Sequence, residues 1–235
     1  MRIPAIHGYI DRRILINYTI DEDVARKMIL QPFRPKLYEG KAVGGICLIR
    51  LKSIKPKGIP DFLGIGSENG AHRFAVEWDE NGETKEGVYI PRRDTSSLAN
   101  ALAGGRIFPG KHYHAKFDVA GGDGNYKVGF TSEDATGIAI EAKETGNYPS
   151  GSIFKTLNTA SDFFEKGCVG FSPNKNKFDG VRLNTYKWEM ISLEVASVRS
   201  SFFENETVFP KGVVVFDNAL LMKNIEHEWL NVKSK

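Results

Sequence analysis

Apolar runs alternate with glycine, proline and asparagine turns along the chain. Residues 13–19 are β-branched and apolar, residues 71–78 alternate between apolar and polar, and residues 212–221 form a long apolar run. Each of these patterns predicts a β-strand. Residues 79–82 (DENG) are typical of a hairpin turn, so the alternating strand is expected to pair with residues 85–90.

Further strands and a few short helices complete the predicted pattern. Asp21 precedes a helical stretch that ends before Pro32, residues 94–97 resemble an N-cap cluster, and residues 159–166 form a third helix closed by Gly167. The remaining predicted strands are residues 42–51, 113–119, 126–131, 137–143, 182–188 and 192–198. The pattern therefore predicts a mainly β (α+β) fold: a closed antiparallel β-barrel with a few short peripheral helices.

Composition narrows the class of protein. The chain has 235 residues, of which 41% are hydrophobic, which is enough for a single domain spanning residues 1–235. A net charge of only +3, without clustered basic residues, makes nucleic acid an unexpected partner. No apolar run approaches the about 18 residues of a membrane span, and the N-terminal residues lack the apolar core of a signal peptide. We therefore expect a cytoplasmic protein without a membrane partner.

Metal and cofactor motifs are absent from the sequence. Cys47 and Cys168 lack the paired spacing of zinc and thiol-redox sites. Cys47 sits in an apolar run and is expected to be a small buried hydrophobe. No phosphate-binding loop or dinucleotide-binding motif occurs either. The sequence therefore predicts no metal and no organic cofactor.

Chemically active side chains concentrate in residues 87–119. A strand-like run ends in PRRD at residues 91–94, two glycine turns follow around Arg106, and a second strand-like run carries His112 and His114. Charged and imidazole groups placed so densely between apolar strands predict a pocket.

Several longer motifs occur together in this chain. They are NYTID (17–21), LIRL (48–51), SENGAHRFAVEW (67–78), GVYIPRRDTSS (87–97), GGRIFPG (104–110), VRSSFF (198–203) and FDNALLMKNIEHEW (216–229). Together they resemble the uncharacterised family called domain of unknown function 2071, which is similar in fold to acetoacetate decarboxylase. The resemblance covers nearly the whole chain.

The resemblance implies a curved antiparallel sheet that closes into a cone-like barrel around a small apolar cavity. In the decarboxylases, a lysine on the strand after a glycine-arginine turn forms an imine with the keto acid. Laying Gly105-Arg106 on that turn places Tyr113 and His114 where the paired lysines belong, and the nearby lysines are out of register. Imine chemistry is therefore not expected at the usual place.

Arg106 and Glu68 are the other residues to which the resemblance gives a role. An arginine facing the cavity would clamp a carboxylate through paired hydrogen bonds. The alternative for Arg106 is a structural salt bridge with Asp94 or Glu68. Glu68 matches a pocket carboxylate of the decarboxylases, which makes it a candidate for proton transfer.

His112 and His114 share one face of a strand because they are two residues apart, which places Tyr113 on the other face. A histidine of this pair, or Tyr113 in its place, is a candidate for proton transfer. A metal would need a third ligand, for which His72 or Glu77 is available. The alternative is that the histidines are hydrogen-bonded within the barrel wall.

Strand alternation sends Arg92 and Arg93 to opposite faces, so that one enters the pocket while the other pairs with Asp94 or solvent. We assign Arg92 to substrate binding. Arg73 is a further substrate-binding candidate, although a cross-strand pair with Glu86 is the favoured alternative.

The sequence thus favours a small-molecule-binding barrel, either a binding protein or a lyase-like enzyme, that takes a small carboxylic or keto acid without an imine lysine. One alternative is a non-catalytic scaffold or regulatory protein with an apolar, sealed cavity. A histidine-based metal enzyme is the other. A homodimer is compatible with the resemblance, although no sequence feature specifies an interface.

Overall fold

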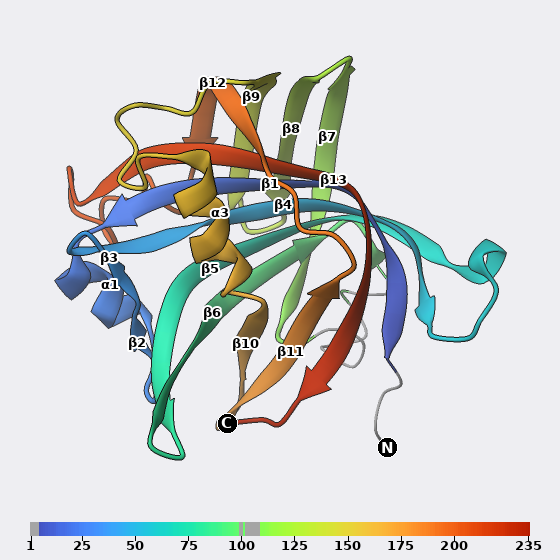
Figure 1. The fold of residues 1–235 in the computed structure, drawn as a ribbon, viewed down its shortest axis with the longest axis horizontal. Helices are drawn as coiled ribbons and strands as arrows, with labels where there is room; N and C mark the ends of the chain where they lie inside the picture. The colour runs from blue at the N-terminus through green and yellow to red at the C-terminus, as the bar shows by residue number, and fades with distance from the viewer. Residues whose placement is uncertain (1–4, 99–100, 102–108) are drawn as a thin grey trace.

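The computed structural model of the protein describes residues 5–98, 101 and 109–235. Helix α1 (Glu22–Met28), helix α3 (Leu157–Glu165) and the 3₁₀ helix η1 (Asp61–Leu63) lie outside a large sheet (Figure 1). No helix in this part of the chain is long and apolar enough to cross a membrane. The strands are β1 (Ile6–Ile20), β2 (Arg34–Pro35), β3 (Leu37–Tyr38), β4 (Lys41–Pro56), β5 (Ile65–Glu80), β6 (Glu83–Thr95), β7 (His112–Gly122), β8 (Asn125–Ser132), β9 (Gly137–Thr145), β10 (Val169–Asn174), β11 (Lys177–Thr185), β12 (Ile191–Ser200) and β13 (Val214–Val232).

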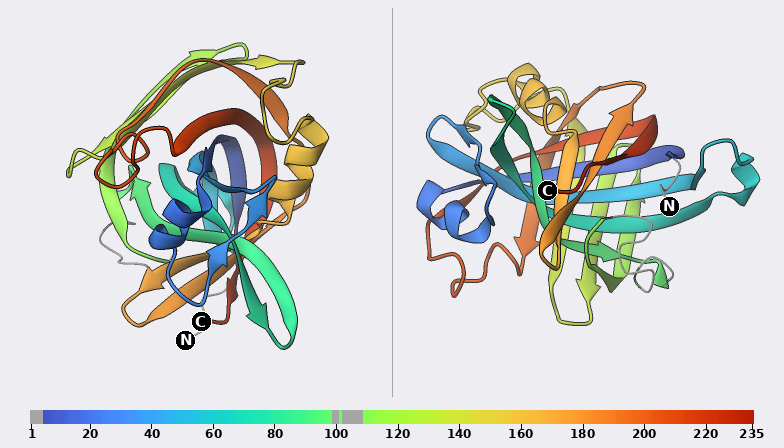
Figure 2. Two further views of the ribbon diagram at one scale, coloured as in Figure 1. Left: turned by 90° about the vertical axis from the view of Figure 1, so that its left-hand side faces the viewer. Right: turned by 90° about the horizontal axis from the view of Figure 1, so that it is seen from below.

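The sheet closes on itself twice within the described residues (Figure 2). A nine-strand ring runs through β6, β7, β8, β9, β12, β13, β1, β4 and β5, and it closes where β5 pairs with β6. A seven-strand ring runs through β6, β10, β11, β13, β1, β4 and β5, and it closes where β11 pairs with β13. The two rings therefore share five strands, β13, β1, β4, β5 and β6.

Two strands make this branching geometry. β6 pairs with β10 through Val88 and Tyr89, and then with β7 through residues 93–95. β13 pairs with β12 through residues 219–221, and then with β11 through residues 227–232. One neighbour replaces the other along the same edge of each strand, so each ring has a complete wall.

The shared strands are buried on both faces because each face looks into a different ring. Ile14 and Ile16 of β1 pack into the core of the nine-strand ring with Phe74 and Phe130. Leu15, which points the opposite way, belongs to a second core that includes Phe164 of α3. This explains why strands such as β4 are apolar almost continuously instead of alternating with polar residues.

The predicted mainly β, closed architecture is confirmed, with differences in detail. The β6–β7 and β6–β10 pairings are parallel in an otherwise mostly antiparallel sheet. β10 was not predicted, and the strand expected at residues 182–188 is β11, Lys177–Thr185. Asp21 precedes α1, but its side chain makes no capping hydrogen bond and instead accepts from Lys41 at 2.7 Å.

Candidate functional site

The seven-strand ring encloses a small cavity, called here the ring cavity, and every strand of the ring contributes to its wall. Its central compartment has a volume of about 110 Å³. Smaller compartments of about 60 and 30 Å³ share lining residues with it and extend toward His112 at one end and toward α3 at the other. The central lining comprises Arg13, Cys47, Ile49, Ala71, Arg73, Val88, Ile90, Arg93, Gly167, Cys168, Gly170, Val181, Leu183 and Trp229.

Arg73 of β5 is the most deeply buried charge in this lining, with 3% of its surface exposed. Its Nη2 donates to Asn17 Oδ1 at 2.5 Å, while its Nε has no hydrogen-bond partner. Gly45 of β4 pairs with both Asn17 and Arg73, so the guanidinium crosses over a residue that has no side chain. Arg73 Cζ also lies 4.9 Å from the centre of the Phe164 ring.

Arg93 of β6 lines the central compartment and the one that extends toward His112. Its Nε donates to Ser172 Oγ at 3.4 Å, which is a long hydrogen bond. Gly110 packs against this pair: its φ is +89°, and a Cβ there would lie 2.6 Å from Ser172 Cβ. Glycine is therefore required at the turn that brings β7 beside Arg93.

Arg13 of β1 is the third guanidinium of the cavity wall. Its Nε donates to Cys47 Sγ at 3.3 Å and its Nη1 to Met222 Sδ at 3.7 Å. Sulfur is a weak acceptor, so these contacts position Arg13 without neutralising its charge.

No carboxylate neutralises these three arginines. Every aspartate and glutamate of the chain lies within the described residues, and none forms an ion pair with Arg13, Arg73 or Arg93. Asp94 contributes to the smaller compartment, but its carboxylate accepts from Arg92 and from Ser132. Burial lowers the pKa of Arg73 and of Arg93 to about 10, so both remain protonated at neutral pH.

His112 is the predicted site residue that lies nearest to Arg93 in the fold. The two residues are paired between the parallel strands β7 and β6, and both line the same compartment. His112 Nδ1 lies 3.2 Å from the Gly110 carbonyl oxygen, to which it donates. Burial and the charge of Arg93 lower the pKa of His112 to about 4, so its imidazole is neutral at physiological pH.

The other predicted catalytic residues do not line the ring cavity. Glu68 accepts from Arg12 at 2.6 Å, Tyr113 stacks against the Arg92 guanidinium at 4.0 Å, and His114 Nδ1 lies 3.8 Å from a Glu133 oxygen.

Arg92, which was assigned to substrate binding, is held by two carboxylates. It donates to Asp94 at 2.7 Å and to Asp134 at 2.6 Å. The predicted split between Arg92 and Arg93 is therefore confirmed, and it is Arg93 that enters the cavity.

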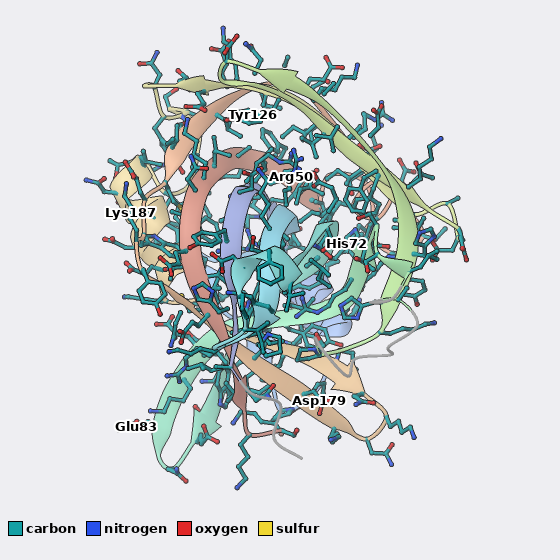
Figure 3. The ribbon with its side chains drawn as sticks, turned by 90° about the vertical axis from the view of Figure 1, so that its right-hand side faces the viewer. Arg50, His72, Glu83, Tyr126, Asp179 and Lys187 are labelled. Atoms are coloured by element: carbon teal, nitrogen blue, oxygen red, sulfur yellow. The ribbon has the colours of Figure 1, made fainter. Side chains whose placement is uncertain are left out.

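The Arg73–Glu86 pair favoured from the sequence is wrong, and His72 is not available to the alternative metal site. Arg73 does not pair with Glu86, because Glu86 lies opposite Glu77 and pairs with Lys36, whereas Arg73 faces the cavity. His72 cannot complete a metal site with His112, because it is fully buried in the nine-strand ring with its centroid 4.5 Å from that of Phe202 (Figure 3).

Glu77 is also unavailable as a metal ligand, since it pairs with Arg34 at 3.5 Å. Among the described residues, no group of three histidine, cysteine, aspartate or glutamate side chains is placed to hold a metal ion. Lys36, the one lysine in the lining of the described cavity, is held by Glu86.

Arg106, the predicted carboxylate clamp, lies outside the described residues. The alternative for Arg106 was a salt bridge with Asp94 or Glu68. Both carboxylates already pair with another arginine, Asp94 with Arg92 and Glu68 with Arg12. Conversely, the assignment of site residues missed Arg13 and Arg93. Strand alternation places Arg92 and Arg93 on opposite faces of β6. It does not show which of the two faces lines a cavity, so Arg93 could not be assigned.

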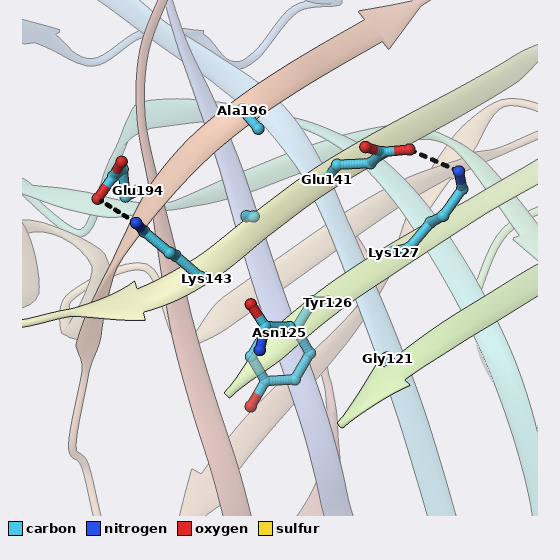
Figure 4. A pocket seen from close by; sticks show the side chains of 9 residues that line it. Gly121, Asn125, Tyr126, Lys127, Glu141, Lys143, Glu194 and Ala196 are labelled. Atoms are coloured by element: carbon cyan, nitrogen blue, oxygen red, sulfur yellow. Dashed lines mark ion pairs between the residues drawn. The ribbon is translucent and has the colours of Figure 1, made fainter. Parts of the chain in front are cut away.

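A larger hollow of about 380 Å³ lies on the outer surface of β8, β9 and β12 (Figure 4). Its charged side chains neutralise one another: Lys127 pairs with Glu141 at 2.6 Å, and Lys143 with Glu194 at 3.2 Å. This surface therefore presents no unpaired charge to a ligand, unlike the ring cavity.

Comparison with known proteins agrees with the fold. The profile of a family described as an uncharacterized conserved protein, domain of unknown function 2071, matches residues 10–218. No curated protein matches the chain. Acetoacetate decarboxylase from Legionella pneumophila is similar in structure, with a TM-score of 0.60 at 12% identity over 98% of this chain and 88% of that one.

Two further structures share the fold. An acetoacetate decarboxylase-like enzyme from Sphingomonas wittichii has a TM-score of 0.59 at 10% identity, covering 99% of this chain and 94% of its own. The enduracididine biosynthesis enzyme MppR, in complex with the condensation product of pyruvate and imidazole 4-carboxaldehyde, has a TM-score of 0.62 at 8% identity, covering 100% of this chain and 90% of its own.

Proposed function

This chain belongs to the family of domain of unknown function 2071, and we propose that it binds a small carboxylic or keto acid in the ring cavity. The observation that carries the proposal is a set of three arginines, the buried Arg73 and the partly buried Arg13 and Arg93, that share this cavity without a carboxylate partner. An anionic ligand supplies the charge that the chain does not.

The physical argument rests on the cost of burying an unpaired charge. Removing an ion from water costs several kcal/mol even after relaxation of the protein, and folded chains usually offset this with an opposite charge. Arg73 has instead a neutral amide, Asn17, and Arg93 a distant hydroxyl, Ser172. Such an arrangement destabilises the empty protein and favours any anion that fits between the guanidiniums.

The size of the cavity sets the size of the ligand. Pockets for drug-sized molecules have volumes of about 300–1,000 Å³, whereas the central compartment has about 110 Å³. A small acid is the matching class. A structural neighbour of 9% identity, MppR, has been solved in complex with pyruvate, which supports this choice of ligand by analogy of fold.

Lyase-like chemistry is the finer part of the proposal. Arg93 would hold the carboxylate and stabilise negative charge that develops during reaction. The neutral imidazole of His112 would accept or return a proton. Lys36 is ion-paired to Glu86, so an imine does not enter this scheme. The other predicted site residues remain alternatives to be tested by mutagenesis: Glu68, Tyr113, His114, Arg92 and Arg106.

The scaffold alternative expects an apolar, sealed cavity. The wall of the described cavity instead holds three guanidinium groups, so we favour ligand binding.

A thermal-shift screen of small carboxylic and keto acids tests the proposal. A ligand present at about 100 times its dissociation constant adds about 2.7 kcal/mol of stability, which raises the Tm of a chain this size by about 5–10 °C. We expect the shift in the wild type and in Arg26→Met, which removes an exposed arginine of α1. We expect none in Arg93→Met. Equal shifts in all three proteins would place the acid elsewhere, and no shift with any acid would favour the scaffold.

A turnover assay separates binding from chemistry. For any acid found in the screen, His112→Gln is expected to keep the thermal shift and to lose conversion of the acid, followed by NMR. Unchanged conversion would remove His112 from the scheme.

A further inference from the structure

Arg73 of β5, which is buried, and Arg93 of β6, which is partly buried, occupy separate positions along the cavity wall. Ala71 of β5 lies directly opposite Arg93 of β6, and Arg73 is two residues further along β5. The β5–β6 register shifts between His72 and Phe74, which is where Arg73 lies, so Arg73 and Arg93 do not face each other directly. Arg73 also lines the compartment that extends toward α3, and Arg93 lines the compartment that extends toward His112, so each guanidinium defines its own end of the cavity.

Each end has its own polar surroundings. At one end, Arg73 meets Asn17, whose Nδ2 donates to Asn218 Oδ1 at 2.7 Å, and the Nε of Arg73 is buried without a partner. At the other end, Arg93 meets Ser172 and lines the compartment that contains His112.

The wall between the two ends is apolar or only weakly polar. It consists of Cys47 and Ala71, with Val88 and Ile90 from β6. Such a wall suits a short hydrocarbon segment, and the charged side chain that reaches it, Arg13, donates to the sulfur atoms of Cys47 and Met222. The cavity thus combines two cationic ends with an apolar centre.

The number of guanidiniums in the cavity also favours a ligand with two carboxylates. A monocarboxylate would neutralise one guanidinium and leave the other buried and unpaired, whereas a ligand with two carboxylates neutralises both. The central volume of about 110 Å³ equals that of about three to four molecules of liquid water at about 30 Å³ each, which is enough for a short chain.

We propose that the ligand of the ring cavity is a short aliphatic dicarboxylate, with one carboxylate on Arg73 and the other on Arg93. This inference rests on the proposed function and specifies its substrate class. Arg13, which lies between Cys47 and Met222 on the same wall, adds a third positive charge that favours a dianion over a monoanion.

Calorimetric titration with matched ligand pairs tests the proposal. Succinate is compared with succinamate, which has the same shape with one carboxylate replaced by a neutral amide, and glutarate with glutaramate. We expect the dicarboxylate of the better-fitting pair to bind about 10-fold or more tightly than its amide, as expected for a charge-assisted pair. The preference should disappear in Arg73→Met and in Arg93→Met and persist in Arg26→Met.

The two ligand pairs also separate this inference from the proposed function. If acids bind in the ring cavity but each dicarboxylate binds no more tightly than its amide, the dicarboxylate assignment is wrong and the monoacid proposal stands. If no acid binds the wild type, both are wrong. The wild-type comparison does not depend on the variants, so it decides the matter even if Arg73→Met fails to fold.

Discussion

Arg93 is a residue whose role in ligand binding and whose role in stability are expected to oppose each other. Its guanidinium is partly buried beside a single distant hydroxyl, Ser172. Arg93→Met removes the cost of burying that charge, so we expect unchanged or higher stability of the ligand-free protein, by about 0.5–2 kcal/mol. Urea unfolding of the purified variant measures this. A loss of more than about 1 kcal/mol in the free energy of unfolding would assign Arg93 a structural role. For scale, about 1.4 kcal/mol corresponds to a tenfold change in the unfolding equilibrium constant.

His72 supplies a prediction about pH. Burial lowers its pKa to about 3, and Asp94, 3.6 Å away, does not reverse this shift. The unfolded state therefore binds the proton more readily, so the stability contribution is complete above pH 6.5 and declines as pH falls toward 3. We expect the protein to lose on the order of 2 kcal/mol between pH 8 and pH 5 from this residue.

Two leucine variants test the predicted pH dependence from His72. His72→Leu should flatten the dependence of unfolding free energy on pH between 8 and 5. His114→Leu, which changes a half-exposed histidine of β7, should leave the dependence as it is in the wild type. Identical slopes in wild type and His72→Leu would contradict the prediction.

Residue-level prediction from the sequence succeeded where a local rule decides the outcome. Alternation separated Arg92 from Arg93 and placed His72 with Phe74, away from Arg73. It did not identify the cavity-facing arginine, because both faces of the shared strands are buried and only the ring on each side distinguishes them. The Arg73–Glu86 pair failed because Glu86 lies opposite Glu77, four residues further along β5 than Arg73.

At the scale of single elements, the β1–β4 pair depends on Gly45. A Cβ at this position would lie 2.2 Å from the Ile16 carbonyl oxygen, which is backbone and cannot move aside. We expect Gly45→Ala to destabilise the protein by about 1–3 kcal/mol and to weaken acid binding, because the new methyl group stands between Asn17 and Arg73.

Gly146→Ala is the control for this substitution, since a Cβ there would meet nothing within 4 Å. Chemical denaturation of both variants, followed by ligand titration, separates the effects. If Gly45→Ala and Gly146→Ala have the same stability, the close approach of β1 and β4 does not constrain position 45.

Elements with strong local patterns were predictable, and those defined by partners were not. The hairpin of β5 and β6 follows from alternation and from the turn at residues 79–82. β10 is short and contains Pro173, so its pattern is weak, and it is a strand because β6 and β11 pair with it. A helix was predicted after residues 94–97, and the described residues Leu98 and Ala101 are helical.

At the scale of the whole molecule, the sequence indicated closure but not that the sheet closes twice. Both closures join segments whose pairing leaves no local signal: β11 meets the far end of β13, and β6 changes neighbour from β10 to β7. The consequence is a division of labour between the two rings. The nine-strand ring holds the larger aromatic core, and the seven-strand ring holds the cavity.

This division predicts that stability and ligand binding can be changed separately. Ile140 of β9 is 1% exposed in the core of the nine-strand ring, and β9 is not part of the seven-strand ring. Ile140→Ala should cost about 2–5 kcal/mol of stability with little change in the dissociation constant of an acid ligand. Because the shared strands are common to both rings, the ligand should raise the Tm of this variant by as much as it raises that of the wild type.

Ile140→Val, expected to cost about 0.5–1.5 kcal/mol, replaces Ile140→Ala in this test if the alanine variant does not fold. A fall in affinity in step with the loss of stability would show that the nine-strand ring, too, shapes the cavity, and that the two rings act as one binding unit.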